Sequence, residues 1–116
     1  MSTRSRIAYK TNKGGYLSIY CHFDGRTVIN ELRAHHGSEK AARSIVGGGD
    51  VSFISGDRVE HYTLRGESFE DNAPMHSPDL LALLALCHDS AGVYLNLFDG
   101  VQWQQVSLQG ACNENR

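Results

Sequence analysis

Polar and apolar residues alternate in two stretches near the start of the chain. Residues 7–9 and residues 16–23 both follow this pattern. Because successive side chains of a strand point to opposite faces, each stretch predicts a half-buried strand. The glycine-containing segment 12–15 between them predicts a turn, since glycine adopts positive φ without strain. We therefore predict an antiparallel hairpin that has Cys21 and Phe23 on its buried face.

Apolar residues recur at helical spacing in three later segments. Residues 28–36 and 39–46 predict two short helices, each with one apolar stripe. Residues 80–87 are apolar nearly all round, which indicates a helix that is buried on more than one side and packs at the centre of the domain. Ser77 and Pro78 predict the start of this helix, with the serine as its cap and the proline at its first position.

Further strands are predicted on either side of that third helix. Residues 50–54 form a short extended segment, and residues 59–64 alternate well enough for a strand. Residues 93–98 and 101–106 alternate around a two-residue Asp-Gly turn, which is the strongest short hairpin signal. In that register Phe98, the last residue of the first strand, faces the first residue of the second strand.

The predicted element order defines the fold class. The order is β-β-α-α-(β)-β-α-β-β, which predicts an α+β domain with an antiparallel sheet of about four to five strands. Two to three helices are expected on one face of that sheet. The 116 residues have the size of one domain with one core. We expect an ordered core over about residues 5–108 and a polar tail over residues 109–116.

Composition narrows the possible classes of protein. Hydrophobic residues make up 41% and charged residues 21% of the chain, which is typical of globular domains and not of disordered ones. The longest apolar run, residues 80–87, is far shorter than the roughly 20 residues that span a bilayer. The polar, basic start has no signal-peptide character. We therefore expect a cytoplasmic protein with no membrane partner.

Charge is distributed unevenly along the chain. The net charge of −2 argues against a general nucleic-acid binder. Residues 1–43 hold eight Lys or Arg and three Asp or Glu, a net +5, whereas residues 44–116 hold three and ten, a net −7. Such a chain can present separate basic and acidic faces to a partner, unless folding interleaves the charges.

The histidines and cysteines form no recognisable metal or catalytic motif. Cys21 and His22 point to opposite faces of a strand and cannot grip one ion. A metal site would need distant residues such as His22, His61 and His76. Cys21 and Cys87 lie on apolar faces, where thiols are inert packing groups. We therefore expect no metal, no cofactor and no enzymatic activity.

Two groups of residues are candidates for contact with a partner. Aromatic residues on one strand face offer large contact area, and with nearby lysines they could also stack single-stranded nucleic acid. The segment 65–76 predicts a mobile acidic loop that can compete with nucleic acid for an arginine-rich groove. Alternatively, the strand face lies under a helix and the acidic segment is only solvated. The candidates are Tyr16, Tyr20, His22, Glu60, Glu67, Glu70 and Asp71.

Three motifs carry a resemblance to known proteins. They are Tyr20-Cys21-His22-Phe23-Asp24-Gly25, Gly49-Asp50-Val51-Ser52, and Phe98-Asp99-Gly100 with Trp103. Over roughly residues 6–106 the chain resembles a set of small uncharacterised bacteriophage and mobile-element proteins. That family usually has Tyr-Pro where this chain has Arg26-Thr27. Small phage proteins without catalytic motifs are often inhibitors of host machinery, including anti-CRISPR proteins, so the resemblance implies such a role.

These observations lead to one expected function and two alternatives. We expect a phage- or prophage-encoded, non-enzymatic binding protein that inhibits a host defence or nucleic-acid-processing complex by occupying a surface. A bacterial CRISPR effector is the specific partner we expect. The first alternative is a small nucleic-acid-binding accessory domain that uses the basic N-terminal hairpin. The second is a metal-dependent enzyme built on the histidines.

Overall fold

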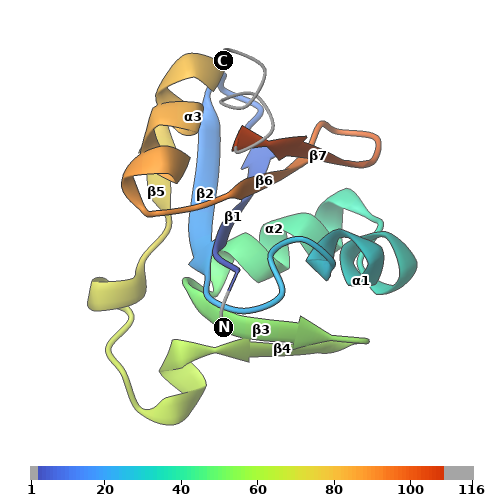
Figure 1. Ribbon diagram of the computed structural model, residues 1–116, viewed down its shortest axis with the longest axis vertical. Helices are drawn as coiled ribbons and strands as arrows, with labels where there is room; N and C mark the ends of the chain where they lie inside the picture. The colour runs from blue at the N-terminus through green and yellow to red at the C-terminus, as the bar shows by residue number, and fades with distance from the viewer. Residues whose placement is uncertain (1–2, 109–116) are drawn as a thin grey trace.

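The computed structural model describes residues 3–108 and shows an α+β domain. Within these residues a mixed sheet of seven strands is flanked by three α-helices (Figure 1). The strands are β1 (Ser5–Lys10), β2 (Tyr16–Cys21), β3 (Val51–Ser55), β4 (Arg58–His61), β5 (Met75–Ser77), β6 (Tyr94–Phe98) and β7 (Trp103–Ser107). The helices are α1 (Val28–His35), α2 (Glu39–Gly47) and α3 (Leu80–Asp89), with 3₁₀ helices η1 (Tyr62–Arg65) and η2 (Glu70–Asn72).

The sheet is mixed, which corrects the expectation of an antiparallel sheet of four to five strands. The strand order is β4-β3-β2-β1-β6-β7, and β5 pairs separately with β2. The hairpin of β1 and β2 is antiparallel as predicted, but β6 lies parallel to β1, with Ile7 opposite Asn96. The long connection from β2 to β6 ends at the end of the sheet where β1 begins, so β6 can run in the same direction as β1.

The outer edge of β2 is shared by two different strands. Its first half pairs antiparallel with β5, from Tyr16 to Ser18. Its last residue, Cys21, pairs parallel with Val51 of β3. The hairpin of β3 and β4 then diverges from the rest of the sheet (Figure 1). A gap in the backbone pairing therefore falls at Tyr20, between the two partners.

The helices lie on both faces of the sheet and not on one face as predicted. Alternation in β1 and β2 separates the two sides, with Ile7 and Ile19 on the side of α1 and α2 and Ala8 on the side of α3. The larger core lies under α1 and α2. It comprises Ile7, Ile19, Cys21, Val28, Ile29, Leu32, Ala42, Ile45, Val46, Val51, Ile54, Phe98 and Trp103.

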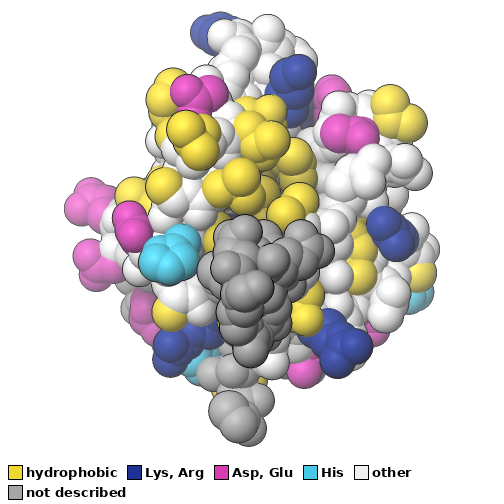
Figure 2. Space-filling model, turned by 45° about the horizontal axis from the view of Figure 1, so that its top comes forward, with side chains coloured by type: hydrophobic (Ala, Val, Ile, Leu, Met, Phe, Trp, Pro, Cys, Tyr) yellow, Lys and Arg dark blue, Asp and Glu magenta, His cyan; other side chains and the backbone are white. Residues whose placement is uncertain are grey.

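Helix α3 is less central than its composition predicted. Only Leu83 and Cys87 of this helix are buried, whereas Leu81 is 77% exposed. The sheet face beneath α3 carries small and polar side chains such as Ala8 and Ser18, so it offers little apolar area. Figure 2 shows hydrophobic side chains gathered over α3 and the sheet beside it. None of the described helices is long and apolar enough to cross a membrane.

Four local predictions also need correction. The cap of α3 is Asp79, whose carboxylate accepts the Ala82 N–H at 2.8 Å, while Ser77 belongs to β5. Strand β2 ends before Phe23, which is 42% exposed instead of buried. The segment predicted as a strand over residues 59–64 turns into η1 after His61, and the predicted loop contains η2 and β5.

The turn between β6 and β7 is longer than two residues. Phe98 faces Trp103, so the loop contains four residues, and the predicted pairing of Phe98 with Val101 is wrong. The Asp99 carboxylate accepts the N–H groups of Val101 and Gln102, both at 2.9 Å. These bonds stabilise the wider turn and bring Trp103 beside Phe98, with the ring centroids 5.4 Å apart in an edge-to-face arrangement.

Candidate partner-binding surface

Asp50 connects the end of β2 to the segment that follows β4. Its Oδ1 accepts the Tyr20 N–H at 2.9 Å, at the point where β2 changes partner. Its own N–H donates to the Asn72 carbonyl at 2.8 Å, and its carbonyl accepts the Tyr62 N–H at 3.1 Å. A buried backbone N–H without a partner is costly, so the carboxylate fills the gap in the sheet. One residue therefore places Tyr20 beside residues 62–72.

The segment over residues 62–72 is folded on itself. The Asn72 Nδ2 donates to the Ser68 carbonyl at 2.9 Å and to Glu67 Oε1 at 3.3 Å. The Glu67 N–H donates to the Tyr62 carbonyl at 3.3 Å. The His61 Nδ1 donates to the Gly49 carbonyl at 2.9 Å and joins the start of the segment to the end of α2. These bonds give the acidic residues of this segment definite positions.

Aromatic side chains form a row at the end of β2. The Tyr20 hydroxyl and His22 Nδ1 lie 2.6 Å apart, and the two rings are both half-buried. The ring of His22 meets the ring of Phe23 edge-on, with centroids 4.4 Å apart. Burial raises the pKa of Tyr20, and interaction with Tyr62 raises it further, whereas Arg4 lowers it. Tyr20, His22 and Phe23 thus lie next to one another in this order, and Tyr62 lies near Tyr20, because the backbone N–H groups of both tyrosines bond to Asp50.

The predicted acidic residues divide into two groups. Glu60 is mostly covered and its carboxylate lies 2.8 Å from Arg58 and 3.7 Å from Arg65, which neutralise it. In contrast, Glu67, Glu70 and Asp71 are exposed. We call the set that combines the row and these three acids the aromatic–acidic surface. It comprises Tyr20, His22, Phe23, Tyr62, Glu67, Glu70 and Asp71.

Tyr16 lies apart from this surface. It is at the opposite end of β2, opposite Lys10 on one side and Ser77 on the other. Its side chain packs against the cluster around Leu83 under α3. Four residues of strand separate it from Tyr20, which corresponds to roughly 13 Å. Sequence alternation placed both tyrosines on one strand face. They do lie on that face, but at opposite ends of β2 and beside different residues.

A buried arginine, Arg6, lies in β1 opposite Tyr20. Arg6 is 3% exposed, and its guanidinium donates to the Ser18 Oγ at 2.9 Å, the Ser18 carbonyl at 3.1 Å and the Ser90 Oγ at 3.0 Å. Burial lowers its pKa, and the nearby Asp50 carboxylate opposes that shift. Sequence reasoning missed Arg6 and Asp50. Alternation gave no signal for the burial of Arg6, because it places Arg6 on the strand face opposite the buried Ile7.

Cys21 and Cys87 are buried within the described part of the chain. Burial raises the pKa of Cys21 to about 12, so its thiol stays protonated near neutral pH and is a poor nucleophile. Within residues 3–108 no group of three or more His, Cys, Asp and Glu side chains is arranged to hold a metal ion. His22 and His61 make the hydrogen bonds described above, and His76 lies in β5 at the other end of β2.

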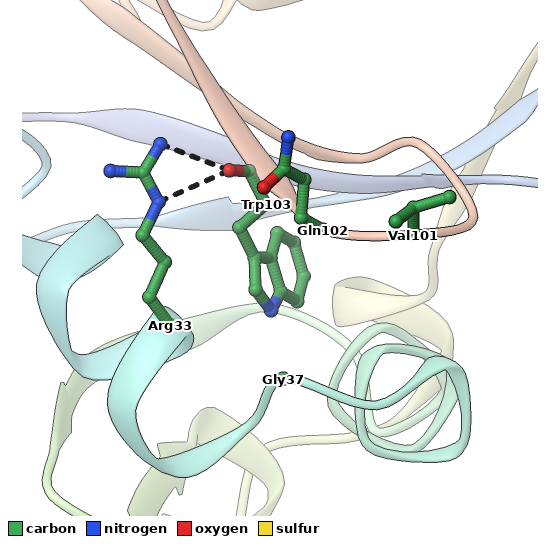
Figure 3. A pocket seen from close by; sticks show the side chains of 5 residues that line it. All are labelled: Arg33, Gly37, Val101, Gln102 and Trp103. Carbon is green, nitrogen blue, oxygen red and sulfur yellow. Dashed lines mark hydrogen bonds between the residues drawn. The ribbon is translucent and has the colours of Figure 1, made fainter.

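A shallow hollow lies between α1 and the turn before β7, where β7 packs against α1 (Figure 3). Its volume is about 290 Å³, and Gly37, Val101 and Gln102 line it with Arg33 and Trp103. The guanidinium of Arg33 donates twice to the Trp103 carbonyl, at 3.1 and 3.0 Å. Because these bonds engage the arginine already, we assign the hollow to the packing of β7 on α1.

No protein-family model, curated protein or solved structure matches this chain.

Replacing Asp50 with asparagine is expected to change the pH dependence of stability. Burial raises the pKa of Asp50 above its ordinary value of 3.8, and Glu67 acts in the same direction, while the Tyr20 N–H and Arg6 oppose. For a carboxyl group with a raised folded pKa, the stabilising contribution is present at low pH and lost as pH rises through that pKa. Asparagine keeps the acceptor for Tyr20 and carries no charge.

The stability of D50N relative to the wild type should therefore be greater at pH 7 than at about pH 3.5. Urea denaturation at a series of pH values measures the difference in the free energy of unfolding. A difference that stays constant across this range, or that shrinks as pH rises, would contradict the unfavourable ionisation of Asp50 in the fold.

Proposed function

We propose that this chain is a phage- or prophage-encoded, non-enzymatic binding protein that inhibits a bacterial defence or nucleic-acid-processing complex by occupying a surface. The observation that supports it most is the aromatic–acidic surface. A bacterial CRISPR effector is the first partner to test. Inhibition needs no catalytic group of this chain, because a partner whose surface is occupied can no longer bind its own substrate there.

The aromatic row suits a protein contact for two physical reasons. Tyrosine rings bring large contact area and lose few rotamers on binding. The hydrogen bond between Tyr20 and His22, and the bond from Tyr62 to Asp50, hold these residues in position before a partner arrives. Side chains that are ordered in advance lose less entropy on association, which favours affinity.

The exposed acids indicate the chemistry of the partner. Glu67, Glu70 and Asp71 add negative charge beside the aromatic row. Such a surface repels phosphate and attracts an arginine- or lysine-rich groove, as found where proteins hold nucleic acid. The partner we propose for this surface is therefore a basic protein groove and not a nucleic acid.

Neutralising two of these acids should weaken the complex. We expect the double variant Glu70→Gln, Asp71→Asn to bind the effector about tenfold more weakly, because each exposed charge pair at an interface contributes roughly 0.7 kcal/mol and about 1.4 kcal/mol corresponds to tenfold. Both residues are exposed, so the fold should be unaffected. The measurement is a pull-down from bacterial lysate that contains a CRISPR effector, followed by titration of the purified complex.

The matched control removes the same charge elsewhere. Asp57→Asn with Asp89→Asn changes two exposed acids outside the aromatic–acidic surface and should leave binding unchanged. Wild-type binding should also weaken as salt rises from about 0.05 M to about 0.5 M, because salt screens exposed charges. If no partner is recovered at any salt concentration, or if both double variants lose affinity equally, the proposed function is wrong.

A further inference from the structure

A second pocket lies at the tip of the β1–β2 hairpin, on the sheet face that α2 covers. Its volume is about 340 Å³, within the size range of small-molecule sites, which begins near 300 Å³. Tyr9 and Leu17 pack against the larger core and form its apolar floor. The lining residues are Tyr9, Thr11, Asn12, Lys13, Leu17, Arg43 and His76.

Three of the lining side chains can carry positive charge and none is acidic. They come from three separate elements: Lys13 from the hairpin turn, Arg43 from α2 and His76 from β5. The Arg43 guanidinium lies over the Tyr9 ring, 5.5 Å from its centroid. Its terminal nitrogen is 3.5 Å from Glu39, while its Nε is buried and has no hydrogen-bond partner within the described part of the chain. The convergence of Lys13, Arg43 and the His76 imidazole around an apolar floor points to an anionic ligand.

The hairpin turn is shaped to admit the imidazole of His76. This residue pairs with Leu17, so the two side chains lie on the same sheet face. At Gly15 an added Cβ would lie 2.7 Å from His76 Nε2, and the backbone has φ +80°. Only glycine meets both conditions without strain. The glycine therefore allows the imidazole to lie against the turn at the edge of the pocket.

A ligand for this pocket must combine an anionic group with a flat or apolar group. Inorganic phosphate would satisfy the cations and leave the floor of Tyr9 and Leu17 unused, whereas a nucleotide uses both. We propose that the pocket binds one nucleotide unit of a single-stranded nucleic acid. Lys13 and Arg43 hold the phosphate, and the base lies against the apolar floor, as in other single-strand binding sites.

This site is separate from the aromatic–acidic surface and does not depend on it. Tyr16 marks the hairpin end of β2 and Tyr20 the opposite end, roughly 13 Å away along the strand. The cationic pocket and the acidic surface have opposite charge, so each would attract a different partner. An inhibitor that binds a basic groove at one end could hold a nucleic-acid strand at the other.

The test is fluorescence anisotropy with a labelled eight-nucleotide oligo-dT at low salt, where phosphate contacts are strongest. We expect Lys13→Gln to weaken binding about fivefold to tenfold, because one phosphate contact is lost. Lys13 lies in an exposed turn, so this variant should fold normally. Arg43→Gln should weaken binding at least as much, and circular dichroism checks its fold.

The matched control is Lys10→Gln. Lys10 is exposed at the same hairpin end, but it follows Tyr9 in β1 and points to the opposite sheet face. This variant should bind like the wild type, and AMP should compete with the oligonucleotide better than inorganic phosphate does. The proposal is overturned if the wild type does not bind, if K10Q loses as much affinity as K13Q, if phosphate competes as well as AMP, or if a short polyglutamate peptide competes better than AMP.

Discussion

Replacing Trp103 with alanine should lower the free energy of unfolding by about 3–5 kcal/mol, the usual cost of truncating a buried aromatic residue. Trp103 is 1% exposed and packs edge-to-face on Phe98. Its indole N–H also donates to the His36 carbonyl at 2.8 Å, which joins β7 to the end of α1. The substitution removes the ring from the larger core and leaves a buried carbonyl without that donor.

Two further substitutions separate these contributions. Trp103→Phe keeps an aromatic ring but loses the bond to His36, so it should cost less than alanine and more than about 1 kcal/mol. Val101→Ala, in the adjoining turn at 81% exposure, should stay within about 0.5 kcal/mol of the wild type. Trp103 is the chain's one tryptophan, so unfolding in urea must be followed by circular dichroism. A loss below about 1 kcal/mol for W103A would contradict its place in the core.

Elements with strong local signals were predicted correctly. The hairpin of β1 and β2 and the helices α1 and α2 follow from alternation, helical spacing and glycine-containing turns. Ser38 caps α2 by accepting the Ala41 N–H at 3.0 Å, a bond that spans three residues. Contacts of this kind are formed by neighbours in the chain, so the sequence contains all the information that specifies them.

Features that depend on distant partners were predicted wrongly or missed. Alternation cannot show that β6 lies parallel to β1, because both neighbours of a strand impose the same periodicity. The Asp-Gly pair led to the prediction of a turn before β7 that is too short. The Asp99 side chain stabilises a longer loop, and Trp103 packs in the core opposite Phe98. The apolar composition of α3 predicted central burial, but burial also requires an apolar surface opposite the helix.

In the candidate surface, too, contacts between chain neighbours were predictable and contacts between distant residues were not. Alternation alone puts Tyr20 and His22 on one strand face, and the structure adds their direct contact. Alternation could not show that Asp50, thirty residues away from Tyr20, fills a gap in the sheet and attaches residues 62–72 there. The expected separation of charge is kept in part. Glu60 is neutralised by Arg58 and Arg65 from its own half of the chain. Glu67, Glu70 and Asp71 stay exposed and still form an acidic group.

Replacing Gly49 with alanine should damage the fold and the aromatic–acidic surface together. Gly49 has φ +87°, and an added Cβ would lie 2.5 Å from the Asn72 carbonyl oxygen. That carbonyl accepts the Asp50 N–H, so the methyl group must push residues 62–72 away from β3. Left-handed strain costs about 1–2 kcal/mol, and displacing packed backbone costs about 1–3 kcal/mol more. We expect a total loss of about 2–5 kcal/mol in the free energy of unfolding.

Gly56 provides the matched control for Gly49→Ala. Its φ is +60°, but an added Cβ there meets nothing within 4 Å, so Gly56→Ala isolates the strain without the collision. We expect that variant to lose only about 1–2 kcal/mol in urea denaturation and to keep its affinity in the pull-down. Gly49→Ala should lose more stability and should also bind more weakly at temperatures where it remains folded, because Tyr62 and the exposed acids move with the Asn72 carbonyl. If the two variants lose equal stability, close packing of residues 62–72 against Gly49 does not contribute to the fold.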